Sequence, residues 1–170
     1  MQPSVTKIEI DEIDVRILNA LQADASISNQ DLAAAVHVSP ATALRRVRWL
    51  VEQGVIERRI ALLAPQVVGG LQALVEVQLD RQGAEHLDAF EAVATTDPAV
   101  QQCWRVAPGP DFVLVLWVAD MAAYNALVQR LFTQQANVRN VKTFFTTRRA
   151  KFEPCIDARE LRRDAGSPAP

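Results

Sequence analysis

The sequence predicts an α+β protein in two parts, in which a bundle of short helices precedes an antiparallel sheet that carries two helices. Two observations predict this division. Up to about Gly54, apolar residues recur every three or four positions, which is typical of amphipathic helices. From Leu71 onward they alternate with polar residues, which is typical of half-buried strands. Between the two patterns, residues 64–70 contain a proline and paired glycines that interrupt both.

The first two helices are predicted from apolar spacing and from a capping signal. The first covers roughly residues 11–21. The second begins at Ser28, and Asp31 three positions later completes a capping-box pattern. Their inward faces are predicted to hold the apolar residues at helical spacing: Ile13, Ile17, Leu18 and Leu21 in the first, and Leu32, Ala35 and Val36 in the second.

A three-residue turn, residues 37–39, leads into a third helix that carries several arginines. Ser39 is placed to cap this helix, and Pro40 stands at its first position, where no backbone donor is lost. Gly54 ends the helix. The spacing predicts an inward face of four apolar residues: Leu44, Val47, Leu50 and Val51. The opposite face then carries Thr42, Arg45, Arg46 and Trp49, with Arg48 at its flank.

Two short helices joined by such a turn form a helix-turn-helix, which places its second helix in the major groove of DNA. An isolated basic cluster is more often a solvated helix face, but the cap, the turn and the inward apolar set favour DNA binding here. Residues 55–63 add a short apolar strand pattern that suits a small wing. Residues 45–59 contain five arginines and only two glutamates, although the whole chain has a net charge of −2. Such a basic patch on an acidic chain is typical of a DNA-binding surface. The expected DNA contacts are Ser39, Pro40, Thr42, Arg45, Arg46, Arg48 and Arg58.

The second half of the chain follows the order βαββαβ. Strands are predicted over residues 75–79, 100–106, 112–118 and 138–147, and helices over residues 87–94 and 124–131. A turn at residues 107–111 separates the second and third strands. This order predicts a four-stranded antiparallel sheet with both helices on one face, which is a ferredoxin-like domain.

The third predicted strand, residues 112–118, is apolar throughout and shows no polar alternation. Because the helices cover only one face of the sheet, the other face needs a second cover, and another copy of the chain supplies it most simply. The alternative is that the chain's own tail covers the strand. The tail after Pro154 carries many charges and ends in Gly-Ser-Pro-Ala-Pro, so we expect it to be flexible and expect the chain to self-associate.

Composition and motifs exclude several other classes of protein. The longest apolar run, residues 112–119, is far too short to span a bilayer, and the first residues show no apolar signal-peptide core. Cys103 and Cys155 form no Cys-x-x-Cys pattern, which favours a reduced cytoplasm and disfavours a metal site. The sequence contains no Gly-rich phosphate loop, no nucleophile motif and no zinc-binding motif. Its two histidines, His37 and His86, lie in contexts typical of a turn or a surface. We therefore expect no catalysis and no cofactor.

Several motifs in order resemble the leucine-responsive and asparagine regulators, the Lrp/AsnC or feast/famine family of transcription factors. They are Asp-Glu-Ile-Asp-Val-Arg-Ile-Leu from residue 11, Ser-Asn-Gln-Asp-Leu-Ala from residue 28, Val-Ser-Pro from residue 38, Arg-Val-Arg from residue 46 and Leu-Val-Glu-Gln-Gly-Val-Ile from residue 50. The likeness continues to about Glu153 of the 170 residues. One departure is His37, which stands where the family usually has glycine; histidine enters the left-handed region more readily than most residues.

The resemblance implies a ligand-response domain that binds a small effector and assembles dimers, which associate further into octamers. In the family the loop between the second and third strands reads Gly-Asp-x-Asp and helps to bind an amino acid. The corresponding residues here, and the expected effector contacts, are Pro108, Gly109, Pro110 and Asp111. Asp111 could pair with a ligand ammonium group and the Gly109 amide could approach a carboxylate. The alternative is an aspartate that only bonds its own turn.

These observations predict a sequence-specific, DNA-binding transcriptional regulator whose oligomeric state or DNA affinity responds to an amino acid or related metabolite. The alternative is a nucleoid-associated architectural protein that wraps DNA with little sequence preference. The expected organisation is a DNA-binding domain over residues 1–60, a linker over 61–71, a ligand-response and oligomerisation domain over 72–153 and a flexible tail over 154–170. The expected partners are double-stranded DNA, a small effector and further copies of the chain, with no membrane.

Overall fold

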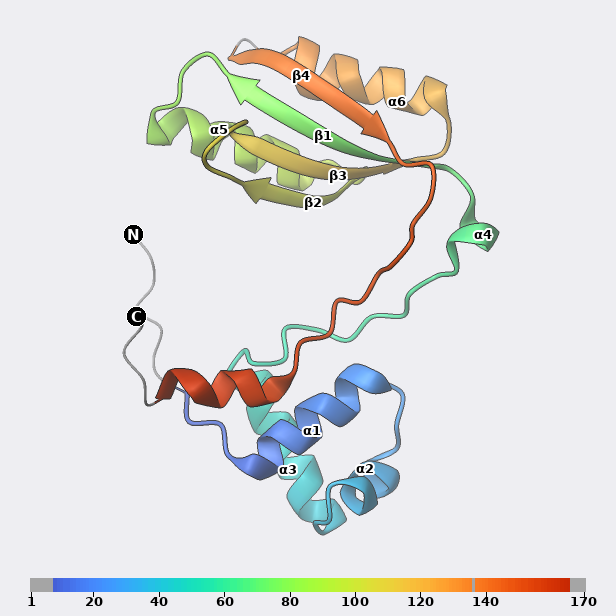
Figure 1. Cartoon of the computed structure of the whole chain (residues 1–170), viewed down its shortest axis with the longest axis vertical. Coiled ribbons are helices and arrows are strands. Elements are labelled where there is room, and N and C mark those ends of the chain that lie inside the picture. Colours follow the sequence, from blue (N-terminus) through green and yellow to red (C-terminus); the bar gives the residue numbers. More distant parts are fainter. Residues whose placement is uncertain (1–7, 136, 166–170) are drawn as a thin grey trace. The chain divides into compact units, whose positions relative to one another are not determined.

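The computed structural model describes residues 8–135 and 137–165 of the chain (Figure 1). The described residues form two units. One unit runs to residue 62 and takes up the chain again from residue 152, and the other covers residues 63–151. We refer to them as the helical unit and the sheet unit. No helix among the described residues is long and apolar enough to cross a membrane.

The helical unit contains three α-helices, each of which starts at a side-chain cap. They are α1 (Glu12–Ala23), α2 (Asn29–Ala35) and α3 (Pro40–Glu52). Asp11 caps α1 in a capping box with Asp14, Ser28 accepts from the Asp31 amide, and Ser39 accepts from the Thr42 amide. The three helices share one apolar core, whose buried members include Val15, Ile17, Leu18, Leu21, Leu32, Val36 and Leu50.

The inward face of α3 differs from the predicted one. Leu44 and Val51 are each 49% exposed, whereas Ala43 is fully buried with Leu50, and Val47 packs against the same core. At residue 43, α3 lies so close to the core that only the methyl group of an alanine fits. The larger side chain of Leu44 then faces outward. The same error occurs in α2, where Ala33 is buried and Ala35 is exposed.

The strand expected over residues 55–63 is not formed in the described chain. Val55 and Ile56 pack against the core of the helical unit, but residues 57–63 carry no regular secondary structure and are exposed. The described part of this unit holds no other strand that could complete a ladder, so the alternating pattern has no partner there. The position expected for a wing is therefore occupied by an unpaired segment that carries Arg58 and Arg59.

We expected a flexible tail over residues 154–170, and this prediction is wrong for the part of the tail that the structure describes. A 3₁₀ helix, η2 (Ala158–Ala165), packs on α1 instead. The side chain of Gln22 bonds both the carbonyl and the amide of Ile156, at 2.8 and 2.9 Å, and the Asn19 amide oxygen accepts from the Ala158 amide at 3.0 Å. These bonds pair backbone groups of Ile156 and Ala158. The side chain of Ala158 is 1% exposed and lies in the core of the helical unit. The Gly-Ser-Pro-Ala-Pro end lies outside the described residues.

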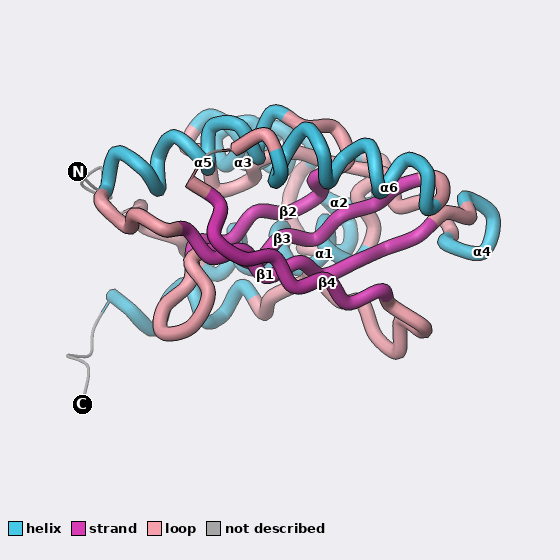
Figure 2. The backbone as a smooth tube through the Cα atoms, turned by 90° about the horizontal axis from the view of Figure 1, so that it is seen from above, coloured by secondary structure: helices cyan, strands magenta, loops and turns pink. Residues whose placement is uncertain are grey.

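The sheet unit has the predicted βαββαβ order. Its strands are β1 (Leu71–Leu79), β2 (Val100–Arg105), β3 (Phe112–Val118) and β4 (Val138–Phe145). They pair antiparallel in the order β2-β3-β1-β4. The helices are α5 (Ala84–Thr96) and α6 (Met121–Leu127), the latter continued by a π-helical stretch, η1 (Val128–Thr133). Both helices run along the same side of the sheet (Figure 2), which is the ferredoxin-like arrangement.

A short helix, α4 (Pro65–Val68), and two glycines lead into β1. The indole N–H of Trp117 donates to the Gly69 carbonyl at 3.1 Å. A Cβ atom on Gly70 would lie 2.7 Å from the Trp117 ring and from the Val118 carbonyl, and the backbone of Gly70 is left-handed at φ 81°. The chain can therefore pass this close to β3 only because residue 70 is glycine.

Candidate DNA-binding surface and effector loop

The turn between α2 and α3 is fixed by its own hydrogen bonds. His37 adopts the left-handed conformation at φ 57°. This agrees with the expectation for a position at which the Lrp/AsnC family, which the sequence resembles, usually has glycine. The Ser39 hydroxyl accepts from the Thr42 amide at 3.2 Å and pairs with the Thr42 hydroxyl at 2.9 Å. The Asn29 side chain donates to the Pro40 carbonyl at 2.9 Å and so ties α2 to the start of α3. The start of α3 is therefore held in one orientation before any ligand binds.

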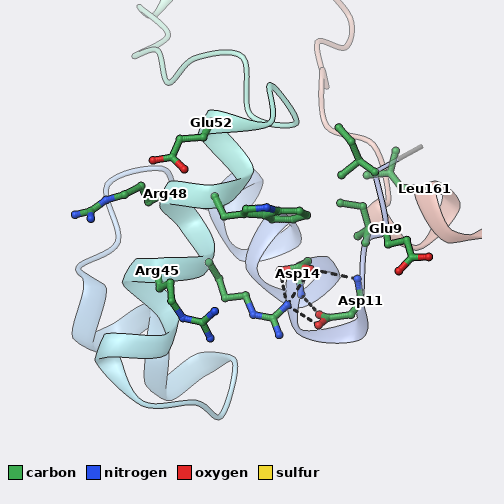
Figure 3. A pocket seen from close by; sticks show the side chains of 11 residues that line it. Glu9, Asp11, Asp14, Arg45, Arg48, Glu52 and Leu161 are labelled. Atoms are coloured by element: carbon green, nitrogen blue, oxygen red, sulfur yellow. Dashed lines mark hydrogen bonds and ion pairs between the residues drawn. The ribbon is translucent and has the colours of Figure 1, made fainter. Parts of the chain in front are cut away.

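The outer face of α3 carries cations that are not engaged elsewhere. Arg45 and Arg48 are exposed, and within the described residues neither forms an ion pair. Both leave α3 without reaching Asp11 or Asp14 (Figure 3). Ser39, Pro40 and Thr42 lie at the first turn of the same helix, where Ser39 and Thr42 bond each other. Arg58 is also exposed, 3.7 Å from Glu57 on the unpaired segment.

Arg46 does not belong to this outer face, which corrects its predicted role. Its guanidinium group binds Asp14 at 3.0 Å and also binds Asp11, and its side chain is only 24% exposed (Figure 3). Asp14 is 1% exposed and needs this cation, because a buried carboxylate without a partner is costly. Arg46 lies between the outer face and the inward face of α3, close enough to α1 for its long side chain to reach the two aspartates.

Asp11 and Arg46 hold each other in their charged forms. Burial raises the pKa of Asp11, but hydrogen bonds from the Asp14 amide and from Arg46 outweigh it and leave the pKa below its ordinary value. The hydrogen bond to Asp11 raises the pKa of Arg46, so the guanidinium stays protonated. This cluster clamps α3 to the start of α1. Sequence reasoning missed the roles of Asp11 and Asp14 because they lie 35 and 32 positions before Arg46.

Trp49 lies on the flank of α3 beside this clamp and packs against the core of the helical unit. A hollow next to it is lined by acidic residues as well as by arginines, among them Glu9, Asp11, Arg45, Arg48 and Glu52 (Figure 3). Its mixed charges do not select one sign of small ligand. Among residues 8–135 and 137–165, no group of His, Cys, Asp or Glu is placed to hold a metal ion.

The predicted effector loop lies between β2 and β3. Pro108 follows a cis peptide bond, Gly109 has φ 128°, and Pro110 is half-buried. Asp111 accepts the Leu79 amide at 2.7 Å through Oδ2 and donates its own amide to the Val77 carbonyl at 2.9 Å. Its carboxylate therefore caps the end of β1, a neighbouring strand, and does not bond its own turn. The four predicted residues are adjacent at one corner of the sheet unit.

The sheet face opposite α5 and α6 is apolar at its centre. On β3, Phe112, Leu114, Leu116 and Val118 are buried under the helices, and Val113, Val115 and Trp117 face the other way, half-buried. Their neighbours in register complete an uncovered patch on which Leu74 is 42%, Phe144 44% and Trp104 58% exposed. We call this the open face. Residues 152–165, the described part of the tail, belong to the helical unit.

Two family models match the two parts of the chain. Residues 10–57 match a model described as winged helix-turn-helix DNA-binding, and residues 72–155 match one described as the Lrp/AsnC ligand binding domain. The first match contains α1 to α3, and the second contains the sheet from residue 72 onward and the loop at Asp111.

Individual proteins agree with the family models over most of the chain. The sequence is 38% identical over 148 residues to a leucine-responsive regulatory protein of Rhizobium meliloti, which covers 86% of this chain and 95% of that protein. A crystal structure of a transcriptional regulator from Neisseria meningitidis in complex with L-Met is similar at a TM-score of 0.81 and 27% identity, covering 90% and 99% of the two chains. A feast or famine regulatory protein from M. tuberculosis, complexed with L-methionine, is similar at a TM-score of 0.74 and 27% identity, covering 87% and 99%.

Proposed function

We propose that this chain, which belongs to the Lrp/AsnC family of transcriptional regulators, binds specific DNA sites through α3 and changes that binding in response to an amino acid or a related metabolite. It is a DNA-binding regulator with a ligand-binding domain and not an enzyme. As part of this proposal, we place its site of action in the cytoplasm.

The observation that carries the DNA-binding proposal is the outer face of α3. The cap at Ser39 and the clamp at Arg46 fix the helix, while Arg45 and Arg48 remain exposed and unpaired within the described residues. Arginine on a recognition helix reads guanine through O6 and N7, and a rigid mount for it limits the entropy lost on binding. In our proposal Ser39, Pro40 and Thr42 approach the backbone at the helix start, and Arg58 contacts phosphate.

Selection of bound fragments from the source genome by the full chain tests this proposal. We expect a limited set of fragments, bound at physiological salt about 10³-fold or more tightly than unrelated DNA. Binding of all fragments within about tenfold of one another would instead support an architectural, DNA-wrapping protein.

Two substitutions separate base contacts from phosphate contacts on a selected fragment. Arg45→Ala should relax base preference at one position of each half-site, at a cost of about 1–3 kcal/mol in discrimination. Arg58→Ala should weaken all sequences alike and reduce the slope of log K against log salt by about one. Unchanged specific and non-specific affinities in Arg45→Ala would contradict the placement of α3 in the groove.

The effector proposal is supported by the match to a ligand-binding domain and by two similar regulators whose solved structures are complexes with L-methionine. For this chain we propose that Pro108, Gly109, Pro110 and Asp111 contact an amino acid. Asp111 Oδ2 is already bonded to the Leu79 amide, so the ammonium partner in this proposal is Oδ1. The departures at residues 108 and 109 leave the identity of the amino acid to experiment.

Calorimetry with the twenty amino acids and the full chain tests the effector proposal. Binding below about millimolar, roughly −4 kcal/mol, supports it, and Asp111→Asn should abolish that binding. We choose asparagine because it keeps an oxygen acceptor for the Leu79 amide and removes only the charge. If none of the twenty binds, the loop serves only the structure of the sheet, and another class of molecule regulates the chain.

We further propose that the open face joins two copies of the chain and that the dimers associate into larger rings, of which an octamer is the expected form. The half-exposed aromatic and aliphatic side chains of this face support the proposal, since such a patch is usually covered by a partner. Two-fold pairing would present two copies of α3 to half-sites about one helical turn apart or a multiple of that.

A further inference from the structure

The outer face of α3 includes an apolar side chain that folding does not explain. Leu44 is 49% exposed although it lies in the second turn of a helix whose other large apolar residues pack inward or lie near its end. It belongs to one row with Ala41 and Arg48, at spacings of three and four residues, and Arg45 follows it directly. An exposed leucine beside two arginines that form no ion pair in the described chain is therefore part of the surface that carries our DNA-binding proposal.

The chemistry of the major groove gives such a side chain a target. Each base pair presents donors and acceptors in the groove, but only thymine also presents a methyl group, at C5. Arginine reads guanine, and an apolar side chain makes contact with the thymine methyl. From this juxtaposition we infer that Leu44 is a specificity-determining residue that packs on a thymine methyl group next to the bases read by Arg45 and Arg48. This inference rests on the proposed function.

The position of Leu44 along α3 supports this role. Residues near the start of a recognition helix are those that reach base edges. The start of α3 is fixed by Ser39, Thr42 and Asn29, so Leu44 lies one turn after a rigid anchor. Val51, which has the same 49% exposure, lies two turns further along the helix, beyond the arginines. It serves as the control for an exposed apolar residue outside the base-reading part.

The experiment first enriches duplexes from a random-sequence library with the full chain, and then replaces each thymine of the enriched duplex, one at a time, by deoxyuridine. This change removes only the C5 methyl group and leaves base pairing intact. We expect one thymine in each half-site at which the wild-type chain loses about fourfold in affinity, which is the effect of burying one methyl-sized group.

Substitution of the protein links that thymine to Leu44. Leu44→Ala should bind the thymine and deoxyuridine duplexes equally, because the methyl group has lost its partner, and should keep its non-specific affinity. Leu44→Met should restore the preference, since it keeps an apolar side chain of similar length. Val51→Ala should discriminate as the wild type does. Circular dichroism checks that each variant is folded, which is expected for exposed positions in a helix.

The outcomes separate this inference from the proposed function. If the library yields no enriched sequence, the proposal of sequence-specific binding fails. If it does yield one, but Leu44→Ala still loses affinity on replacement of the same thymine, or no thymine can be replaced with a loss, the inference about Leu44 is wrong while the proposed function stands.

Discussion

Arg46 connects residues that are distant in the sequence, and its substitution should show what the connection contributes. Arg46→Ala leaves Asp14, which is 1% exposed, with a carboxylate that has lost its cation. We expect a loss of about 2 kcal/mol in the free energy of unfolding, the magnitude for a hydrogen bond to a charged group, measured by urea denaturation of the full chain. Arg45→Ala is the matched control, because it removes an adjacent arginine that has no ion pair in the described chain. Equal stability of the two variants would contradict a clamp.

The same clamp predicts a dependence on pH with a definite sign. The pKa of Asp11 is held below its ordinary value of 3.8. A carboxylate of this kind contributes stability above its unfolded pKa and loses it as the pH falls through the folded pKa. The difference in stability between the wild type and Arg46→Ala should therefore be constant near neutral pH and shrink below about pH 4. A difference that grew on acidification would contradict the assignment.

At the residue scale, features that depend on neighbouring residues could be predicted from the sequence, and features that depend on distant residues could not. The caps at Ser28 and Ser39 and the left-handed turn at His37 follow from local patterns. The ion pair of Arg46 does not, because nothing near residue 46 indicates which residues of α1 will face it. The sequence pattern also predicted that Leu44 faces inward. Apolar spacing alone does not show that Ala43, the smaller neighbour, is the buried residue instead.

At the scale of elements, the connection into β1 depends on a glycine whose replacement should be costly. Gly69 and Gly70 both have positive φ, but a Cβ atom on Gly69 meets nothing within 4 Å, whereas one on Gly70 lies 2.7 Å from Trp117 and Val118. Gly69→Ala should cost about 1–3 kcal/mol of stability through strain alone, because φ 68° with ψ −153° is a conformation that essentially only glycine adopts. Gly70→Ala should cost about 2 kcal/mol more, because the overlap adds to the strain. Thermal denaturation of the two variants compares them directly, and equal costs would show that β3 moves away without resistance.

The C-terminal segment is the element whose behaviour the sequence concealed. Its many charges suggested flexibility, yet Ala158 is buried in the helical unit. The Asn19 side chain accepts from the Ala158 amide, and the Gln22 side chain bonds the backbone of Ile156, two positions earlier. One small apolar residue among charged ones leaves no periodic pattern. The order of the sheet, in contrast, was predictable because strands of alternating residues and a fixed βαββαβ order leave few arrangements.

Disruption of this contact should affect the helical unit alone. Ala158→Asp places a charge in an apolar core and should cost about 2–3 kcal/mol, whereas Arg159→Ala at the next, exposed position should cost little. Hydrogen exchange resolves the effect by residue. We expect lost protection in α1 to α3 and unchanged protection in β1 to β4. Uniform loss of protection in both units would show that the two do not unfold separately.

At the scale of the whole molecule, the chain passes from the helical unit to the sheet unit and back, so the sheet unit is inserted between residue 62 and residue 152. Two covalent connections therefore join the DNA-binding helices to the domain that we propose binds the effector. The division expected from sequence placed one linker at residues 61–71 and did not foresee the return. An effector changes DNA affinity only by its different affinity for two states of the assembly.

Assembly through the open face gives the last prediction. Trp104→Glu and Leu74→Lys each place a charge on an apolar face, where pairing of two copies would bury it, so we expect dissociation at micromolar concentration in light scattering. Met121→Glu is the control, because Met121 is 47% exposed on α6, on the covered side of the sheet, and its charge should leave assembly unchanged.

Loss of pairing should also weaken binding to a two-half-site duplex by about a hundredfold, since the two recognition helices no longer bind as one unit. Binding to a single half-site should not change. Variants that stay assembled with full affinity for the paired site would move the interface away from this face.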